Sequence, residues 1–381
     1  MLGRRSDRAQ MTVDPVRHLY IHVPFCARRC SYCDFSIAVR SSVPVATYVE
    51  SIALEIARHD TRRWDLDTIY LGGGTPSRLD AGVASVVKIV RENASVAADA
   101  EITVEANPDD VTPANAAAWI DAGVNRVSLG AQSFDPSALE WMHRTHSVEQ
   151  IVGAIGTLRT AGITNVSLDL IFALPESIPR DWGADLERAL ELEPEHVSLY
   201  GLTIEPRTPL GRWRARGQVV EAPEERYEAD FMMAHERLDA AGFEHYEVSN
   251  FGRPGRRSRH NSSYWTGEPY AALGPSAHSF DGDARSWNVA AYADWERRLR
   301  SGESVVAERE LLTRENRLSE RVYLGLRTID GLPATDAEID VARPWVEAGW
   351  AEITNRTIVL TATGFLRLDA IAASLTLAGS R

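Results

Sequence analysis

The three cysteines of this 381-residue chain constrain it more than any other feature, because they all fall within one short segment. Cys26, Cys30 and Cys33 follow the β-rich run His18–Val23 with the spacing C-x3-C-x2-C. An odd, clustered set is a poor framework for disulfides. Three thiolates on one loop can instead bind three irons of a [4Fe–4S] cluster and leave the fourth iron open. We therefore predict an iron–sulfur cluster here, in a reducing compartment.

The open iron of such a cluster predicts a second ligand. An amine and a carboxylate together can chelate it, and the methionine end of S-adenosylmethionine (SAM) offers that pair. An electron passed to the bound sulfonium would then cleave SAM to a 5′-deoxyadenosyl radical. Two other interpretations stay open at this point. His22 gives the donor set of a Cys3His zinc site, and the thiols could be structural, although a loop rich in Arg and Pro is an unusual core.

A β-rich run, a polar or glycine-containing break and an amphipathic stretch recur along the chain. Runs rich in Val, Ile and Leu are typical of buried parallel strands. The expected strands are His18–Val23, Thr68–Leu71, Glu101–Glu105, Arg126–Gly130, Asn165–Phe172 and His196–Leu202. The expected helices are Val45–Arg58, Ala81–Glu92, Pro113–Ala122, Val148–Ala161, Arg180–Leu192 and Pro223–Ala241. Six successive βα units predict an α/β fold, an open (β/α)6 partial TIM barrel with its function at the carboxyl ends of the strands.

The chain divides into four expected parts. Residues 1–16 are predicted to be a flexible tail, within which Met11 is an alternative start, and residues 17–245 form the barrel core. Residues 246–307 are rich in Gly, Ser, Asn and aromatic residues with little periodicity, which predicts a linker. Residues 308–381 are predicted to form a small, mainly helical C-terminal domain with one hairpin around Asn355, an α+β arrangement resembling a winged helix.

Polar and glycine residues stand where the expected strands end. The second strand ends in a Gly72-Gly73-Gly74-Thr75 run, and glycines let a ligand approach the backbone closely. Glu105 ends the third strand, and a carboxylate there can bind ribose hydroxyls. Gln132 follows the fourth strand and Asp169 lies in the fifth. Taken singly, each of these side chains could equally well serve only to hydrogen-bond with backbone groups of a nearby loop.

Together with the cysteine loop, these motifs resemble those of the radical SAM superfamily over residues 20–202. The loop, with Tyr32 before its last cysteine, is most similar to the branch that contains oxygen-independent coproporphyrinogen III oxidase and the heme chaperone HemW family. The resemblance implies that residues 17–245 are a radical SAM core. The SAM contacts that it implies are Tyr20, Gly72, Gly73, Thr75, Glu105, Gln132, Arg144 and Asp169. One departure is Phe172-Ala173, where the family often has Tyr-Gly.

Two activities compete within this branch. The oxidases have a fourth cysteine two residues after the third, where this chain has Phe35, and a longer N-terminal segment. The segment Arg259–Trp265 instead resembles the HNxxYW signature of the heme chaperones, so residues 246–307 also form the heme-signature region. The resemblance implies that His260 binds heme, since imidazole is a good axial ligand. The alternative is that His260 and Asn261 only fix the linker, while Trp265 fills the seam between domains.

Composition limits the partners. The formal net charge of −13 disfavours nucleic acid, and the single lysine, Lys88, leaves almost no candidate for Schiff-base or phosphate-loop chemistry. No apolar run is long enough for a transmembrane helix, and no signal peptide is evident. We expect a cytoplasmic heme carrier with a [4Fe–4S] cluster, SAM and heme. It would pass heme to recipients such as respiratory enzymes, through transient contact with membrane proteins, and no catalytic residue is predicted. A coproporphyrinogen III oxidase is the alternative.

Overall fold

A twelve-stranded sheet organises the molecule in the computed structural model, which describes residues 15–379. Six neighbouring parallel strands form its centre, in chain order. They are β1 (Val16–Val23), β4 (Trp64–Gly73), β5 (Ser95–Ala106), β6 (Arg126–Gln132), β7 (Asn165–Phe172) and β8 (His196–Gly201). The outermost strands are not paired with each other, so the open (β/α)6 barrel is confirmed. Met11 and nearly all of the predicted tail lie outside the described residues, and β1 begins at Val16.

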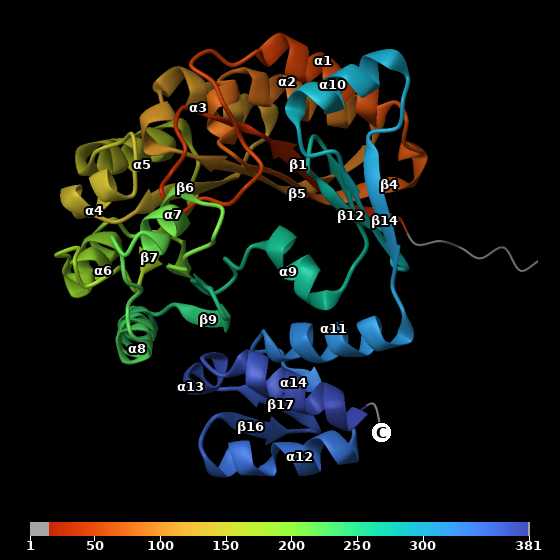
Figure 1. Cartoon of the computed structure of the whole chain (residues 1–381). Coiled ribbons are helices and arrows are strands. Elements are labelled where there is room, and N and C mark those ends of the chain that lie inside the picture. Colours follow the sequence, from red (N-terminus) through yellow and green to blue (C-terminus); the bar gives the residue numbers. More distant parts are fainter. Residues whose placement is uncertain (1–14, 380–381) are drawn as a thin grey trace, which may run out of the picture.

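Helices cover the outer face of this sheet (Figure 1). They are α1 (Val45–Ile56), α2 (Gly82–Asn93), α3 (Pro113–Ala122), α5 (Val148–Ala161), α6 (Trp182–Glu191) and α8 (Glu224–Ala240). Two shorter helices, α4 (Pro136–Trp141) and α7 (Pro209–Ala215), pack next to the loop that follows β1. Local sequence sets their ends. The Thr112 side chain accepts a hydrogen bond from the Asn115 N–H at the start of α3, and Gly123 ends this helix with φ of 93°.

Residues 246–307 are not the linker that the sequence predicts, because they extend the sheet at both edges. The added elements are β9 (Glu244–Glu247), β10 (Asn250–Gly252), α9 (Arg259–Thr266), β11 (Tyr270–Leu273), β12 (His278–Phe280), β13 (Ala284–Asn288), α10 (Tyr292–Ser301) and β14 (Val306–Leu311). β11 pairs in parallel with β1, and β10 pairs antiparallel with β8. Hydrogen bonds to the exposed edges of the barrel sheet order these short strands, and a local sequence pattern does not record such pairings.

The C-terminal domain lies at the amino ends of the barrel strands, below α9 in Figure 1. It consists of α11 (Arg314–Leu326), β15 (Leu332–Pro333), α12 (Asp336–Glu347), β16 (Ala351–Thr354), β17 (Thr357–Leu360), α13 (Ala362–Phe365) and α14 (Leu368–Gly379). The predicted hairpin is confirmed, and Asn355 and Arg356 turn it with φ of 50° and 63°. Within the described residues we find no helix with the length and apolar character needed to span a bilayer.

Candidate functional site

The cysteine loop crosses the carboxyl end of the barrel directly after β1. A short parallel pair, β2 (Phe25–Cys26) and β3 (Ala38–Val39), closes the loop. The Ser31 N–H donates to the Met142 carbonyl, and the Ser31 carbonyl accepts from the Leu210 N–H. These bonds tie the loop to the segments after β6 and β8. As a result, all three thiols line one cavity of about 430 Å³.

The donor set around this cavity fits a cluster of several irons. Thr75 Oγ1 donates to Cys26 Sγ at 3.4 Å, and Arg144 Nη1 donates to Cys30 Sγ at 3.3 Å. Burial raises the pKa of the Cys26 thiol to about 11, so iron must replace its proton. Hydrogen bonds and a cation directed at sulfur stabilise thiolate ligands.

The zinc interpretation has less support. Both ring nitrogens of His22 are engaged, Nδ1 with Tyr20 Oη at 3.1 Å and Nε2 with the Ser36 carbonyl at 3.2 Å. Among residues 15–379, no three His, Cys, Asp or Glu side chains converge on a point where a single metal ion could bind. The three cysteines instead share the lining of one cavity, which has room for a cluster of several irons.

The strand ends supply the second half of the cavity. Glu105, at the end of β5, accepts from Tyr70 Oη at 2.8 Å and from the Gly73 N–H at 3.0 Å. Burial raises the pKa of Glu105 to about 7. Gly73 has φ of 113°, and a Cβ there would contact the His22 ring at 2.6 Å, so only glycine fits.

Arg144 organises another part of the cavity wall. Arg144 Nη2 donates to Asn107 Oδ1 at 2.6 Å and to the Gly130 carbonyl at 3.0 Å. Asp169 in β7 accepts from Ser128 Oγ at 2.9 Å, and burial raises its pKa. A carboxylate can accept about four hydrogen bonds, so Asp169 and Glu105 retain capacity to accept from a ligand.

Most of the predicted site residues meet in this cavity. Its lining includes Cys26, Cys30, Cys33, Gly73, Thr75, Glu105, Gln132, Arg144 and Asp169. Gly72 and Tyr20 stand one layer behind it, since a Cβ on Gly72 would lie 3.0 Å from both Glu105 Oε1 and Tyr20 Cε2. The sequence analysis missed Asn107, Ser128, Tyr200 and Tyr70. An inward position on a predicted strand is the signal that could have identified Ser128 and Tyr70.

His260 lies away from this cavity, inside the barrel and toward the amino ends of the strands. It is fully buried. Its Nδ1 is 2.7 Å from Thr68 Oγ1 and its Nε2 is 2.8 Å from Tyr264 Oη, so neither ring nitrogen is free. Burial lowers its pKa to about 3. Heme coordination by His260 stays a prediction, and it would require α9 to leave the barrel.

Comparisons with known proteins agree with this geometry. The model of the radical SAM superfamily matches residues 20–189, which include the cysteine loop. The chain is 39% identical to the heme chaperone HemW of Synechocystis over 82% of this chain and 78% of that protein. It is 35% identical to the heme chaperone HemW of Mycobacterium tuberculosis over 94% of both.

A solved structure shows the same fold. Coproporphyrinogen III oxidase (HemN) from Escherichia coli, described as a radical SAM enzyme, superposes with a TM-score of 0.80. The match covers 95% of this chain and 90% of that one at 21% sequence identity. At this level of identity the similarity concerns the fold.

Proposed function

The chain belongs to the heme chaperone HemW family of radical SAM proteins, and from that premise we propose that it binds a [4Fe–4S] cluster, SAM and heme and delivers heme to recipient proteins. The observation that best supports binding of the cluster and SAM is the cavity that Cys26, Cys30 and Cys33 line together with Glu105 and Asp169. Cys26, Cys30 and Cys33 would hold the cluster, and once reduced the cluster would supply the electron that cleaves bound SAM.

The chain's own residues would hold SAM along its length. The Gly73–Thr75 backbone lines the cavity and could accept a hydrogen bond from the amino group of SAM, while Glu105 and Asp169 could accept from the ribose hydroxyls at its other end. Arg144 would orient a thiolate and the adjacent loop through its bonds to Cys30 and Asn107. We place the protein in the cytoplasm. Heme-accepting proteins such as respiratory enzymes would be its partners.

The test is an anaerobic reconstitution with iron and sulfide, followed by three measurements on the same preparation. We expect an electron paramagnetic resonance spectrum of a reduced [4Fe–4S] cluster that changes when SAM is added. A heme titration should saturate, and the heme-loaded protein should transfer heme to an apo-heme protein. The Cys26→Ser/Cys30→Ser/Cys33→Ser variant is the control, and it should lose the cluster spectrum.

Contrary results would be equally clear. Absence of heme uptake by the reconstituted protein would contradict the chaperone proposal. Consumption of coproporphyrinogen III with SAM and a reductant would instead favour the oxidase. Zinc bound in stoichiometric amount by the wild-type protein, and absent from the serine variant, would contradict the cluster.

A further inference from the structure

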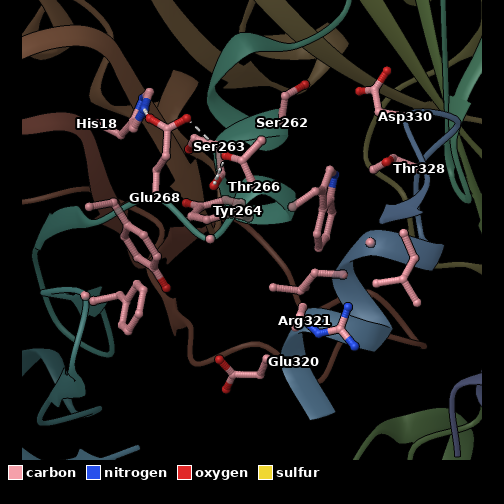
Figure 2. A pocket seen from close by; sticks show the side chains of 18 of the residues that line it. His18, Ser262, Ser263, Tyr264, Thr266, Glu268, Glu320, Arg321, Thr328 and Asp330 are labelled. Atoms are coloured by element: carbon pink, nitrogen blue, oxygen red, sulfur yellow. Dashed lines mark hydrogen bonds and ion pairs between the residues drawn. The ribbon is translucent and has the colours of Figure 1, made fainter. Parts of the chain in front are cut away.

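A second cavity lies at the opposite end of the barrel from the cysteines. It encloses about 1170 Å³ between α9, the turn that leads into β11, and α11 of the C-terminal domain. Figure 2 shows His18 and Glu268 next to each other on one wall, Tyr264 of α9 beside them, and Glu320 and Arg321 of α11 across the space. Sites for drug-sized ligands run roughly 300–1,000 Å³. This cleft therefore has room for a large ligand.

The walls of the cleft combine aromatic faces with arginines. Tyr264, Trp265, Tyr270 and Phe280 contribute apolar surface. Arg259 and Arg317 contribute charge, and each is paired with a carboxylate that is largely exposed, Asp99 and Asp283 respectively. Exposed pairs of this kind contribute little, so these guanidinium groups can exchange partners at small cost. A flat apolar ligand with anionic substituents suits such a surface.

His18 is the one histidine among the described residues that line the cleft, and none of them is cysteine or methionine. Its Nδ1 is 3.0 Å from Thr68 Oγ1, which fixes the ring from behind. Its Nε2 is 2.9 Å from Glu268 Oε2, and the Glu268 side chain is 47% exposed. A half-exposed carboxylate can turn toward solvent, and Nε2 would then face the cleft. A metal-ligating histidine usually donates its other ring N–H to an oxygen acceptor, and Thr68 Oγ1 can be that acceptor for His18 Nδ1.

The other donors near the cleft are less suitable for iron. His260 has both nitrogens engaged within the barrel. Tyr264 and Tyr270 would have to ionise, and burial raises the pKa of both phenols. The backbone N–H groups of Arg259 and His260 donate to Glu101 at 3.0 Å, which anchors the start of α9. His260 therefore acts as a positioning residue that fixes α9, one wall of the cleft.

We propose that heme binds in this cleft with His18 Nε2 as its axial ligand, in place of the contact with Glu268, while Arg259 and Arg317 lie within reach of the propionates. This inference rests on the proposed function, since it assigns a site to the heme that a chaperone carries. It also separates the two sites. The cluster cavity opens at the carboxyl ends of the strands, and heme would bind at their amino ends.

The test uses the full-length protein, heme titration and resonance Raman spectroscopy. His18→Gln retains a group that can hydrogen-bond to Thr68 but is a poor iron ligand. We expect this variant to lose the imidazole-ligated low-spin spectrum and its Kd for heme to rise about tenfold or more. Glu268→Ala should lower the Kd, because it removes the group that competes for Nε2. His278→Gln, outside the cleft on β12, is the matched control and should behave as wild type.

The possible outcomes distinguish an error in the proposed heme site from an error in the proposed chaperone function. If the wild type takes up no heme, the proposed function fails. If it binds heme and His18→Gln keeps the wild-type spectrum and Kd, the site is wrong and the function stands. Loss of the imidazole signature in His260→Gln but not in His18→Gln would assign the ligand to His260 and overturn the inference. Should His18→Gln not fold, an unchanged Kd in Glu268→Ala would contradict it.

Discussion

Ala173 shows how one methyl group bears on the turn after β7, where the family often has glycine. Its φ is 54°, in the left-handed region, and its N–H donates to Asp230 Oδ2 at 3.2 Å. A non-glycine residue in this region costs about 1 kcal/mol, part of which the flexibility of glycine in the unfolded chain offsets. We expect Ala173→Gly to raise the free energy of unfolding by ~0.5 kcal/mol, measured by urea denaturation.

The matched control for this substitution is Ala117→Gly, at an exposed position within α3. It should lower the free energy of unfolding by roughly 0.5–1 kcal/mol, because glycine is a poor helix former. If Ala173→Gly destabilises the protein as much as Ala117→Gly does, the methyl group is not strained.

Glu105 is the residue on which SAM affinity should depend most. Its carboxylate lies between Tyr70 and Gly73 at the floor of the cavity, and burial raises its pKa to about 7. Glu105→Gln should weaken SAM binding about tenfold while the iron content stays unchanged. Because the ionised form accepts hydrogen bonds best, wild-type affinity should increase as the pH rises through about 7. The affinity of the variant should not.

The control lies on the same strand. Glu101 in β5 is more deeply buried than Glu105 and accepts from the start of α9 at the other end of the barrel. Glu101→Gln should leave SAM affinity, measured by equilibrium dialysis, within error of wild type. An equal loss in both variants would mean that a general disturbance of β5 explains the effect.

At the scale of elements, Glu55 of α1 joins three segments that are distant in sequence. It accepts hydrogen bonds from the Gly274 N–H at 2.8 Å, Asn288 Nδ2 at 2.6 Å and Trp295 Nε1 at 3.1 Å. Burial raises its pKa from 4.5 to about 7. The folded protein therefore holds this proton more tightly than the unfolded chain. The stability that results is complete below pH 4.5 and is lost as the pH rises through 7.

Glu55→Gln removes this titration. Relative to wild type, the variant should gain up to ~3 kcal/mol in free energy of unfolding between pH 5 and pH 8. Urea denaturation of both proteins at the two pH values measures the change. A difference between the proteins that is the same at both pH values would contradict the assignment of this titration to Glu55.

The elements that could be predicted from the sequence are those whose pattern is local. Asn165–Phe172 is a continuous apolar run, and its strand has those bounds in the structure. Tyr270–Leu273 is a strand only because it pairs with β1, some 250 residues earlier in the chain, and four residues carry no usable periodicity. The complete burial of His260 could not be predicted from the sequence for the same reason. Nothing in residues 259–265 indicates that Thr68 and Tyr70 would surround it.

At the scale of the whole molecule, the cysteine cavity could be predicted because parallel strands bring their carboxyl ends together whatever the details of pairing. Residues from β4, β5, β6 and β7 then reach one place. The cleft at the other end of the barrel could not be predicted from the sequence, because its walls come from β1, α9 and α11. Their arrangement depends on how the C-terminal domain docks. That docking is the remaining determinant of the proposed heme site.

Arg327, directly after α11, holds the C-terminal domain on the barrel edge. Its Nε is 3.1 Å from Glu247 Oε2, with Glu247 fully buried, and its guanidinium lies 4.3 Å from the centre of the Trp265 ring. Arg327→Met leaves the Glu247 carboxylate buried without its cation, which should cost about 3–5 kcal/mol of stability. Adding Glu247→Gln removes the unpaired charge, so the double variant should be more stable than Arg327→Met alone.

The exposed Arg343–Asp340 pair of α12 is the comparison, and Arg343→Met should cost less than about 1 kcal/mol. Thermal denaturation measures all four proteins. Since α11 forms one wall of the cleft, Arg327→Met should also bind heme more weakly, whereas Arg343→Met should not. If Arg327→Met is no less stable than Arg343→Met, the seam is held by the backbone bonds from Val248 to Arg327 and from Ile329 to Tyr246, and the ion pair is not what positions the domain.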